Sequence, residues 1–265
     1  FDDEPEQYLV AAVLRPGNVN ASKGALGILR RLVRKLRAAF PKARLRVRLD
    51  GGFATPEIFD FLEDERLEYL VAIAKNPRLG PQGERLLASA RRVARQTGRS
   101  AAFFGETRYA ARKWTRGKRR VIYKAEVVCL AGRAPRDNLR FVVTNLAHRP
   151  ERVYDLYRQR GDDENRIKEL HHGLELDRTS CHRFLANQLR VLMTAAAYVL
   201  LQELRRRAKG TRCEAAQVTT LRERLLKLAA WFEVSVRRVV VHLPRSFAWR
   251  PCWLRLAAQL GAAPG

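Results

Sequence analysis

Three acids stand side by side in the stretch YRQRGDDENRIKELHHG, which covers residues 157–173. If this stretch is a helix that turns by about 100° per residue, Glu164 is the acid that shares a face with basic and hydrogen-bonding side chains. Those side chains are Tyr157, Arg160, Lys168 and His171. Carboxylate oxygens are ligands that Mg²⁺ and Mn²⁺ prefer, so this face could contribute to a divalent-metal site.

The same stretch also has an ordinary structural interpretation. Asp162 points to the opposite face and could cap the start of the helix, where acids complement the helix dipole. The basic face could simply be solvated, and Gly161 could break the helix before Glu164. An apolar stripe beside the Glu164 face predicts packing on a core; it consists of Leu156, Ile167, Leu170 and Leu174.

Asp50 is a second candidate carboxylate. It ends the segment RLRVRLD, in which polar and apolar residues alternate as in a strand, and Gly51 and Gly52 follow at once. A carboxylate at the carboxyl end of a strand lies where α/β sheets place their ligands. The glycines would allow a sharp turn or a close approach of a ligand. An ordinary Asp-Gly turn is the alternative.

The elements around Asp50 follow the order of an α/β layer. Apolar runs predict buried strands at residues 8–14 and 69–74, on either side of the alternating strand at 44–50. A helix is expected from a cap at Asn20 or Ser22 to Phe40, and another over residues 55–65. Strands that alternate with helices in this way predict the α/β class.

The composition changes after about residue 90. Residues 91–124 hold twelve basic side chains and one acid, and β-type segments joined by turn-like sequences follow a helix that runs to about Arg95. After Pro150 the pattern becomes helical, with a long helix over 183–208, another near 219–232, a short strand at 236–243 and a C-terminal helix. The predicted parts are residues 1–90, the β-rich segment 91–149, residues 150–208, and the extension 209–265.

The charge of the chain narrows the choice of partner. The formal net charge is +25 and the calculated pI is about 11.1, which favours a polyanionic partner, most simply nucleic acid, over a merely basic surface. The four cysteines stand far apart, which is typical of a reducing cytoplasm. The apolar run 189–201 contains Arg190 and is too short to span a bilayer, so a buried helix and no membrane partner are expected.

These features together resemble bacterial insertion-sequence transposases of the DDE class. The signature of that group has the form Y-x2-R-x3-E-x6-K, and this chain supplies Tyr157, Arg160 and Glu164 at those spacings, with His171 in place of the lysine. Supporting stretches are LRPGN, RLDGGF, YLVAIAKNPRL, ENRIKEL and LDRTSCHRFLANQLR. The similarity covers nearly the whole chain.

The resemblance implies an RNase H-like core, a mixed sheet with flanking helices, that is interrupted by a β-rich insertion and followed by C-terminal helices. It makes Asp50 and Glu164 the second and third carboxylates of a catalytic triad that holds two Mg²⁺ or Mn²⁺ ions. The first Asp of the triad is expected upstream of Phe1. The chain would then be a C-terminal fragment.

The resemblance also implies an activity and its partners. Water attacks a phosphodiester at a transposon end, and the freed 3′-hydroxyl then attacks a second phosphodiester, so both transposon ends and target DNA are expected partners. A homodimer assembled on DNA and a bacterial cytoplasmic, nucleoid-associated location are expected too. Arg160 would hold a backbone phosphate, with Tyr157, Lys168 and His171 beside it.

The basic run ARKWTRGKRR in the β-rich segment supplies further expected DNA contacts, at Trp114, Arg116, Lys118 and Arg119. Trp114 could stack on a base that has left the duplex stack. Packing of its ring in the core or against a hairpin is the alternative.

Two other functions stay open. The chain could be a non-catalytic, basic DNA-binding remnant of a truncated element, or a nuclease that cuts without strand transfer. Carboxylates that share a pair of metal ions about 4 Å apart should lie roughly 4 to 8 Å from each other, so the separation of Asp50 and Glu164 is the quantity that distinguishes a metal site from a helix cap.

Overall fold

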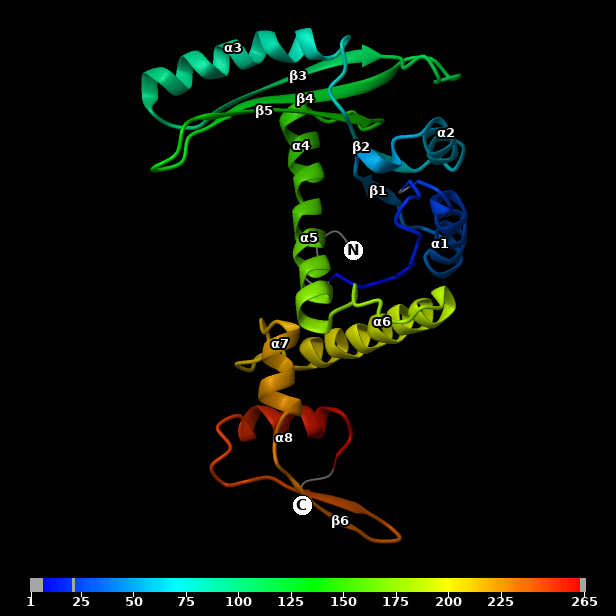
Figure 1. Cartoon of the computed structure of the whole chain (residues 1–265), viewed down its shortest axis with the longest axis vertical. Coiled ribbons are helices and arrows are strands. Elements are labelled where there is room, and N and C mark those ends of the chain that lie inside the picture. Colours follow the sequence, from blue (N-terminus) through cyan, green and yellow to red (C-terminus); the bar gives the residue numbers. More distant parts are fainter. Residues whose placement is uncertain (1–6, 21, 263–265) are drawn as a thin grey trace. The chain divides into compact units, whose positions relative to one another are not determined.

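The structure is a computed structural model, and it describes residues 7–20 and 22–262. The side chains of Arg160, Asp162 and Asp163 also lie outside the description. The chain forms two compact units (Figure 1). Residues 17–160 form one, called here the sheet unit, and residues 1–16 with 161–265 form the other, the helical unit. These units do not follow the expected division at residues 90, 149 and 208.

A five-stranded mixed sheet organises the sheet unit, in the order β1-β2-β5-β4-β3. β1 pairs with β2 in parallel, and the other neighbours are antiparallel. The strands are β1 (Arg46–Leu49), β2 (Glu68–Ile73), β3 (Ala101–Tyr109), β4 (Arg119–Val128) and β5 (Arg136–Thr144). The predicted α/β class is therefore confirmed. Because β5 pairs with β2, the strands expected in an insertion continue the sheet of the preceding elements.

The helices of the sheet unit cover both faces of the sheet. On one face lie α1 (Ala25–Ala39), α2 (Pro56–Asp64) and α3 (Gly80–Thr97). They pack on strand side chains whose neighbours along the strands, Leu70, Ile122 and Val142, point to the opposite face. On the other face α4 (Pro150–Arg158) packs against these three. Period-two alternation in β2, β4 and β5 thus gives two separate apolar cores.

Local sequence signals account for several of these elements. The expected strands at 44–50 and 69–74 and the helix at 55–65 are confirmed as β1, β2 and α2, the last with Pro56 in its first turn. α3 ends at Gly98, whose φ of 67° lies in the left-handed region. The expected cap of α1 is wrong, because Gly24 precedes that helix and Asn20 instead accepts a hydrogen bond from the backbone N–H of Ser22.

The helical unit packs around a core of its own, formed by residues such as Leu170, Tyr198 and Leu221. Its helices are α5 (Arg160–Lys168), α6 (Phe184–Arg207), α7 (Val218–Leu221) and α8 (Arg250–Gln259), with π-helical turns η2 (Glu169–Gly173) and η3 (Arg222–Leu226). A hairpin joins β6 (Trp231–Val234) to β7 (Val239–His242). The expected helix near 219–232 therefore ends at Leu226, and its last residues form a strand instead.

The expected strand at residues 8–14 is wrong. The segment lies outside the sheets formed by the described residues and runs beside α6, where side-chain oxygens replace strand partners. Gln202 Oε1 accepts from the backbone N–H of Leu9 at 3.2 Å, and Gln188 Oε1 accepts from that of Leu14 at 3.0 Å. An apolar run forms a strand only when another strand supplies a ladder of hydrogen bonds.

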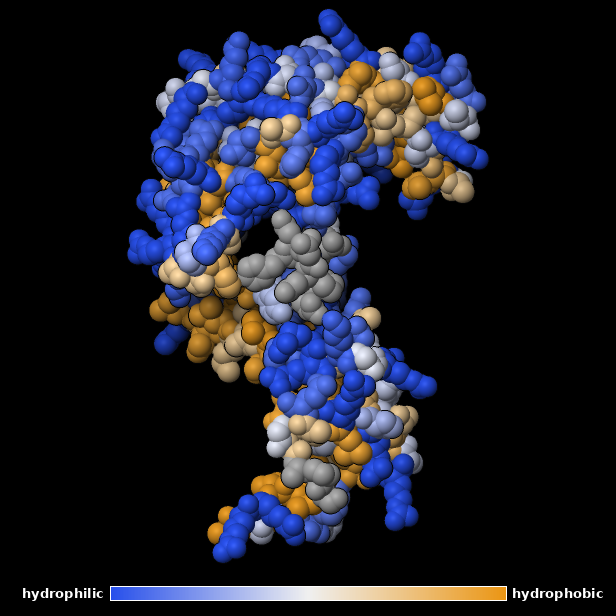
Figure 2. All heavy atoms as spheres, turned by 180° about the vertical axis from the view of Figure 1, so that it is seen from behind, coloured by the Kyte–Doolittle hydropathy of each residue, from blue (hydrophilic) through white to orange (hydrophobic). Residues whose placement is uncertain are grey.

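Helix α6 exposes much of its apolar surface within the helical unit, which corrects the expected buried helix at 189–201. Leu185, Met193 and Leu200 are 79%, 66% and 72% exposed, and hydrophobic side chains gather over this helix in Figure 2. With 24 residues, and a mean hydropathy of 1.4 over its most apolar 18-residue window, α6 is long and apolar enough to cross a membrane by length and composition alone, a test that core helices of soluble proteins also pass. The expected absence of a membrane partner stays a prediction.

Candidate nucleic-acid and metal site

Asp50 follows directly on β1 and begins the 3₁₀ turn η1 (Gly51–Phe53). Its Oδ1 atom accepts a hydrogen bond of 2.9 Å from the backbone N–H of Gly52. The Asp50 side chain is exposed, so its carboxylate is open to solvent although it caps the turn. The turn foreseen as the alternative is therefore present, and it fixes the direction of the carboxylate without burying it.

The register of the sheet places Asp50 on the face that α4 covers. Arg48 lies opposite Leu70, which packs against α4. The backbone of Asp50 is still extended, with φ −78° and ψ 177°, so side-chain alternation continues and Asp50 points to the same face as Arg48. Strand β1 thus directs its terminal carboxylate toward the side of the sheet that carries the first part of the signature stretch.

A direct contact joins β1 to the end of α4. Arg48 Nη1 donates to the backbone oxygen of Leu156 at 3.1 Å and to Gln159 Oε1 at 3.0 Å. Gln159 is the residue that separates α4 from α5. The strand that ends in Asp50 is therefore bonded to the last turn of the helix that carries Tyr157.

The signature stretch is helical, as expected, but its faces differ from the expected ones. Tyr157 is only 7% exposed and packs between α4 and the sheet, so its expected role as a DNA contact is corrected to core packing. Ile167, expected in the apolar stripe, is 49% exposed, whereas Leu170 is buried. Glu164 and Lys168 are exposed on α5, and the side chain of Arg160 lies outside the described part of the chain.

His171 lies in the π-helical turn η2, where the turn of about 100° per residue no longer applies. Its expected position on the Glu164 face therefore does not follow from helix geometry. The Nδ1 atom of His171 lies 3.4 Å from Asp177 Oδ2, a contact that becomes an ion pair when the imidazole is protonated. A phosphate contact by His171 stays a prediction.

Glu169, which no sequence pattern singled out, is a highly bonded carboxylate of this region. Its Oε1 atom lies 2.5 Å from Arg205 Nη2 and accepts from the backbone N–H of Val218 at 2.9 Å. Its Oε2 atom accepts from Tyr198 at 3.0 Å and from Arg166 at 3.1 Å. Burial raises the pKa of the Glu169 carboxyl, but the hydrogen bond from Val218 and the charge of Arg205 outweigh it and hold that pKa below its usual value.

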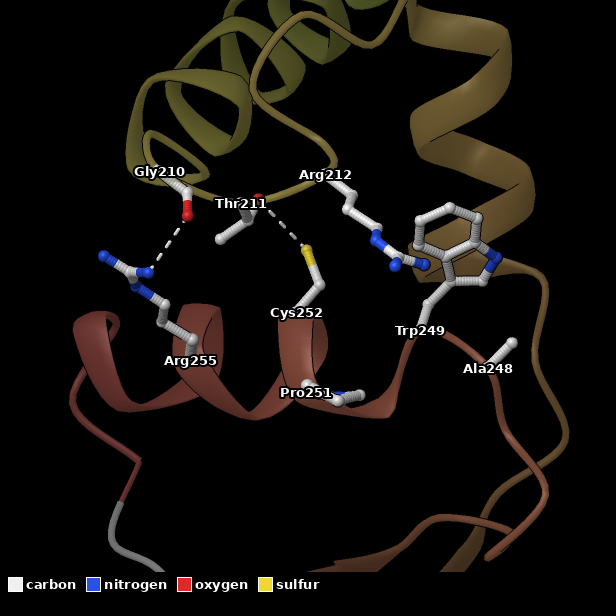
Figure 3. Close-up of a pocket in the computed structure, with 8 residues that line it drawn as sticks. All are labelled: Gly210, Thr211, Arg212, Ala248, Trp249, Pro251, Cys252 and Arg255. Carbon is white, nitrogen blue, oxygen red and sulfur yellow. Dashed lines mark hydrogen bonds between the residues drawn. The ribbon is translucent and has the colours of Figure 1, made fainter.

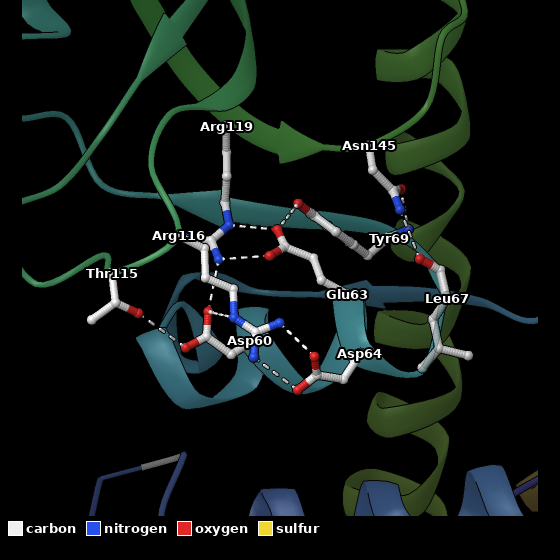
Figure 4. Close-up of polar contacts among 9 residues, drawn as sticks. All are labelled: Asp60, Glu63, Asp64, Leu67, Tyr69, Thr115, Arg116, Arg119 and Asn145. Carbon is white, nitrogen blue, oxygen red and sulfur yellow. Dashed lines mark hydrogen bonds and ion pairs between the residues drawn. The ribbon is translucent and has the colours of Figure 1, made fainter.

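The basic run of the β-rich segment is anchored to helix α2 (Figure 4). Arg119, with a side chain only 4% exposed, forms ion pairs with Glu63 at 2.6 Å and Asp60 at 2.9 Å. Arg116 binds Asp64 through two nitrogens, at 2.5 and 3.0 Å. A buried guanidinium held by two carboxylates has no surface for a phosphate, so Arg119 is corrected from a DNA contact to a structural ion pair.

Trp114 belongs to the same anchored region. Its ring lies 5.1 Å from that of Phe59 and 5.4 Å from that of Tyr109, with the Arg119 guanidinium 4.9 Å from the ring centroid. These contacts occupy the indole, which favours the packing role over stacking on a base. Lys118, by contrast, is exposed and stays an expected DNA contact.

The donor chemistry of Asp50 and Glu164 fits Mg²⁺, but the structure does not complete a metal site. Within residues 7–20 and 22–262, no group of three or more His, Cys, Asp or Glu side chains is placed to hold a metal ion. Asp50 belongs to the sheet unit and Glu164 to the helical unit. Their pairing on shared metal ions therefore stays a prediction from the motif.

A pocket of about 460 Å³ in the helical unit is lined by the loop after α6 and by α8 (Figure 3). Cys252 Sγ lies 3.3 Å from Thr211 Oγ1, which also accepts from the backbone N–H of Cys213 at 3.1 Å. Burial, with the neighbouring Cys252 thiol, raises the pKa of Cys213 to about 11. Raised thiol pKa values are typical of structural cysteines rather than nucleophiles.

Comparison with protein families gives a match over nearly the whole chain. No curated protein matches the chain. The family described as transposase DDE domain group 1 matches residues 1–264, a range that includes β1 with Asp50 and the whole signature stretch. Because that match extends over nearly every residue, the chain belongs to the DDE transposase family.

Proposed function

We propose that this chain is the catalytic region of a bacterial insertion-sequence transposase, which hydrolyses a phosphodiester at the end of the element and joins the freed 3′-hydroxyl to DNA. The observation that carries the proposal is the position of Asp50. In a chain that belongs to the DDE family, an exposed carboxylate ends a parallel strand, on the sheet face covered by the helix that begins the signature stretch.

Within this proposal, Asp50 and Glu164 would hold the metal, with Mg²⁺ or Mn²⁺ as the ion and two ions as in the related reaction. A divalent ion at these carboxylates supplies charge stabilisation for displacement at phosphorus. Asp50 keeps its orientation through the hydrogen bond from Gly52, so the carboxylate is set before any ion binds.

Basic side chains would position DNA without reading its sequence. Lys168 on α5 and Lys118 before β4 are exposed, and Arg160 and His171 complete the proposed phosphate contacts of the signature stretch. Arg116 could contribute only if a phosphate displaced Asp64 from its guanidinium. Binding to transposon ends and target DNA, as a homodimer, in the bacterial cytoplasm, is part of the same proposal.

The test is the effect of metal on DNA binding, measured by fluorescence anisotropy with a labelled duplex at constant ionic strength. Mg²⁺ is expected to tighten binding by about fivefold, which corresponds to about 1 kcal/mol. Asp50→Asn and Glu164→Gln should each abolish that gain. Glu203→Gln is the matched control, because Glu203 is an acid of α6 that pairs with Arg206 and Arg207.

The outcome separates this proposal from the alternatives. Binding that is strong, salt-sensitive and unchanged by Mg²⁺ or by Asp50→Asn would identify a non-catalytic DNA-binding remnant. Metal-dependent nicking of plasmid DNA without joined products would identify a nuclease. Joined products that need both Asp50 and Glu164 would support the transposase.

A further inference from the structure

Arg48 joins two parts of the sheet unit, the strand that leads to Asp50 and the end of α4. It lies two residues before Asp50 and on the same face of the sheet. Its side chain is partly buried and reaches the end of α4, where Nη1 contacts the Leu156 carbonyl and the Gln159 side chain. A single nitrogen of Arg48 therefore bonds β1, the strand that presents the Asp50 carboxylate, to the end of helix α4.

The contact between Arg48 and the end of α4 joins groups that attract each other. The last carbonyls of a helix carry the negative end of its dipole, and a cation there is favourable. Gln159 stands between α4 and α5, and its side chain marks the joint between these two helices. A hydrogen bond from a charged group is also stronger than a neutral one.

The neighbouring arginine of the same strand has a different role. Arg46 lies on the same face as Arg48, but its guanidinium binds Glu68 of β2 at 2.7 to 2.8 Å. Arg46 thus holds β1 to β2, whereas Arg48 holds β1 to α4. The pair offers a comparison in which the charge, the strand and the face are the same, whereas the bonded partners differ.

We propose that Arg48 is a positioning residue, which holds the joint between α4 and α5 at a fixed distance from the Asp50 carboxylate. This inference rests on the proposed function, because it assigns a role to a bond that otherwise only stabilises the fold. If Arg48 is removed, Asp50 stays where β1 and Gly52 put it, and the end of α4 with Gln159 loses its constant position relative to it.

The test is cleavage of the chain by Fe²⁺ with ascorbate and peroxide, in which radicals cut the backbone close to the bound ion. In the unaltered protein, cuts are expected near Asp50 and near the joint at Gln159, and both should disappear in Asp50→Asn. Arg48→Ala should keep the cut near Asp50 and weaken the one near Gln159 by about fivefold, as loss of about 1 kcal/mol of positioning predicts.

Two variants show whether the effect belongs to the bond. Arg48→Lys keeps an ammonium that can donate to both acceptors and should restore much of the second cut. Arg46→Ala should leave the ratio of the two cuts unchanged. If Arg48→Ala lowers the melting temperature too far for the measurement, Gln159→Ala removes one acceptor of the same nitrogen and should give a smaller change in the same direction.

The outcomes are distinct. A ratio of cuts in Arg48→Ala equal to that of the unaltered protein would overturn the role of Arg48 and leave the proposed function standing. The absence of any cut near Asp50 in the unaltered protein would overturn the proposed function and the role of Arg48 with it.

Discussion

Glu169 Oε1 and Arg205 Nη2 lie 2.5 Å apart, and this ion pair joins the π-helical turn that follows α5 to helix α6. Both side chains are almost fully buried, at 5% and 10% exposed. Tyr198, Arg166 and the backbone N–H of Val218 also bond the same carboxylate. The end of the signature stretch is thus fixed in the core of the helical unit by one acid.

We expect Glu169→Gln to lower the free energy of unfolding by about 3 kcal/mol, because it leaves the buried Arg205 without its counter-charge. Urea unfolding at pH 7 measures this. Glu203→Gln is the control: it removes an α6 acid that is 39% exposed and ion-paired with two arginines, and it should cost below about 0.5 kcal/mol. Equal losses in the two variants would contradict the importance of burial.

The same carboxylate predicts how stability depends on pH. The pKa of Glu169 is lower in the folded state than in the unfolded state, so its contribution is present above the unfolded pKa of about 4.3 and is lost as the pH falls through the folded pKa. The difference in unfolding free energy between the unaltered protein and Glu169→Gln should therefore shrink below about pH 4. A difference that grew on acidification would have the wrong sign.

The sequence predicted correctly those elements that are determined by patterns of neighbouring residues. Alternation predicted β1, and the Thr-Pro start and the apolar spacing predicted α2, because neighbouring residues decide these elements. The spacing of Tyr157, Arg160 and Glu164 identified the family that the match over residues 1–264 shows.

The errors concern features that depend on contacts between residues far apart in the sequence. Glu169 bonds Tyr198 and Val218, which lie 29 and 49 residues along the chain, and Arg119 bonds Glu63 across 56 residues. No local pattern contains such pairs. The expected place of His171 assumes one fixed angle per residue, and such a helix model cannot anticipate the π-helical turn that contains this residue.

Arg119 and Lys118 are adjacent in sequence but should respond to substitution in opposite ways. Arg119→Met should lower the stability of the protein by about 3 kcal/mol, because it leaves Glu63 and Asp60 without a buried counter-charge. Lys118→Ala should leave stability within about 0.5 kcal/mol. Thermal unfolding at neutral pH compares the two.

In DNA binding, the larger effect should come from Lys118→Ala rather than from Arg119→Met. Lys118→Ala should weaken binding and reduce the slope of affinity against salt by about one unit, as loss of one phosphate contact predicts. A folded variant of Arg119 should keep the slope of the unaltered protein. A reduced slope for Arg119 instead would restore it as a DNA contact.

The cysteines should differ sharply in reactivity. Alkylation requires the thiolate, and a pKa raised from 9.0 to about 11 leaves Cys213 with about 100-fold less thiolate at pH 8. Cys181 is exposed and should react first with iodoacetamide in the native protein, as peptide mass spectrometry can measure. In urea the two rates should converge, because unfolding removes the burial that raises the pKa of Cys213.

Cys252→Ser separates the two causes of that raised pKa. Burial is the larger cause and persists in the variant, whereas the neighbouring thiol is removed, so the alkylation of Cys213 should become faster but remain slower than that of Cys181. Native Cys213 that reacts as fast as Cys181 at pH 8 would show instead that the loop after α6 opens on the timescale of the reaction. The rate at several reagent concentrations distinguishes these cases, because a rate limited by opening no longer rises with reagent.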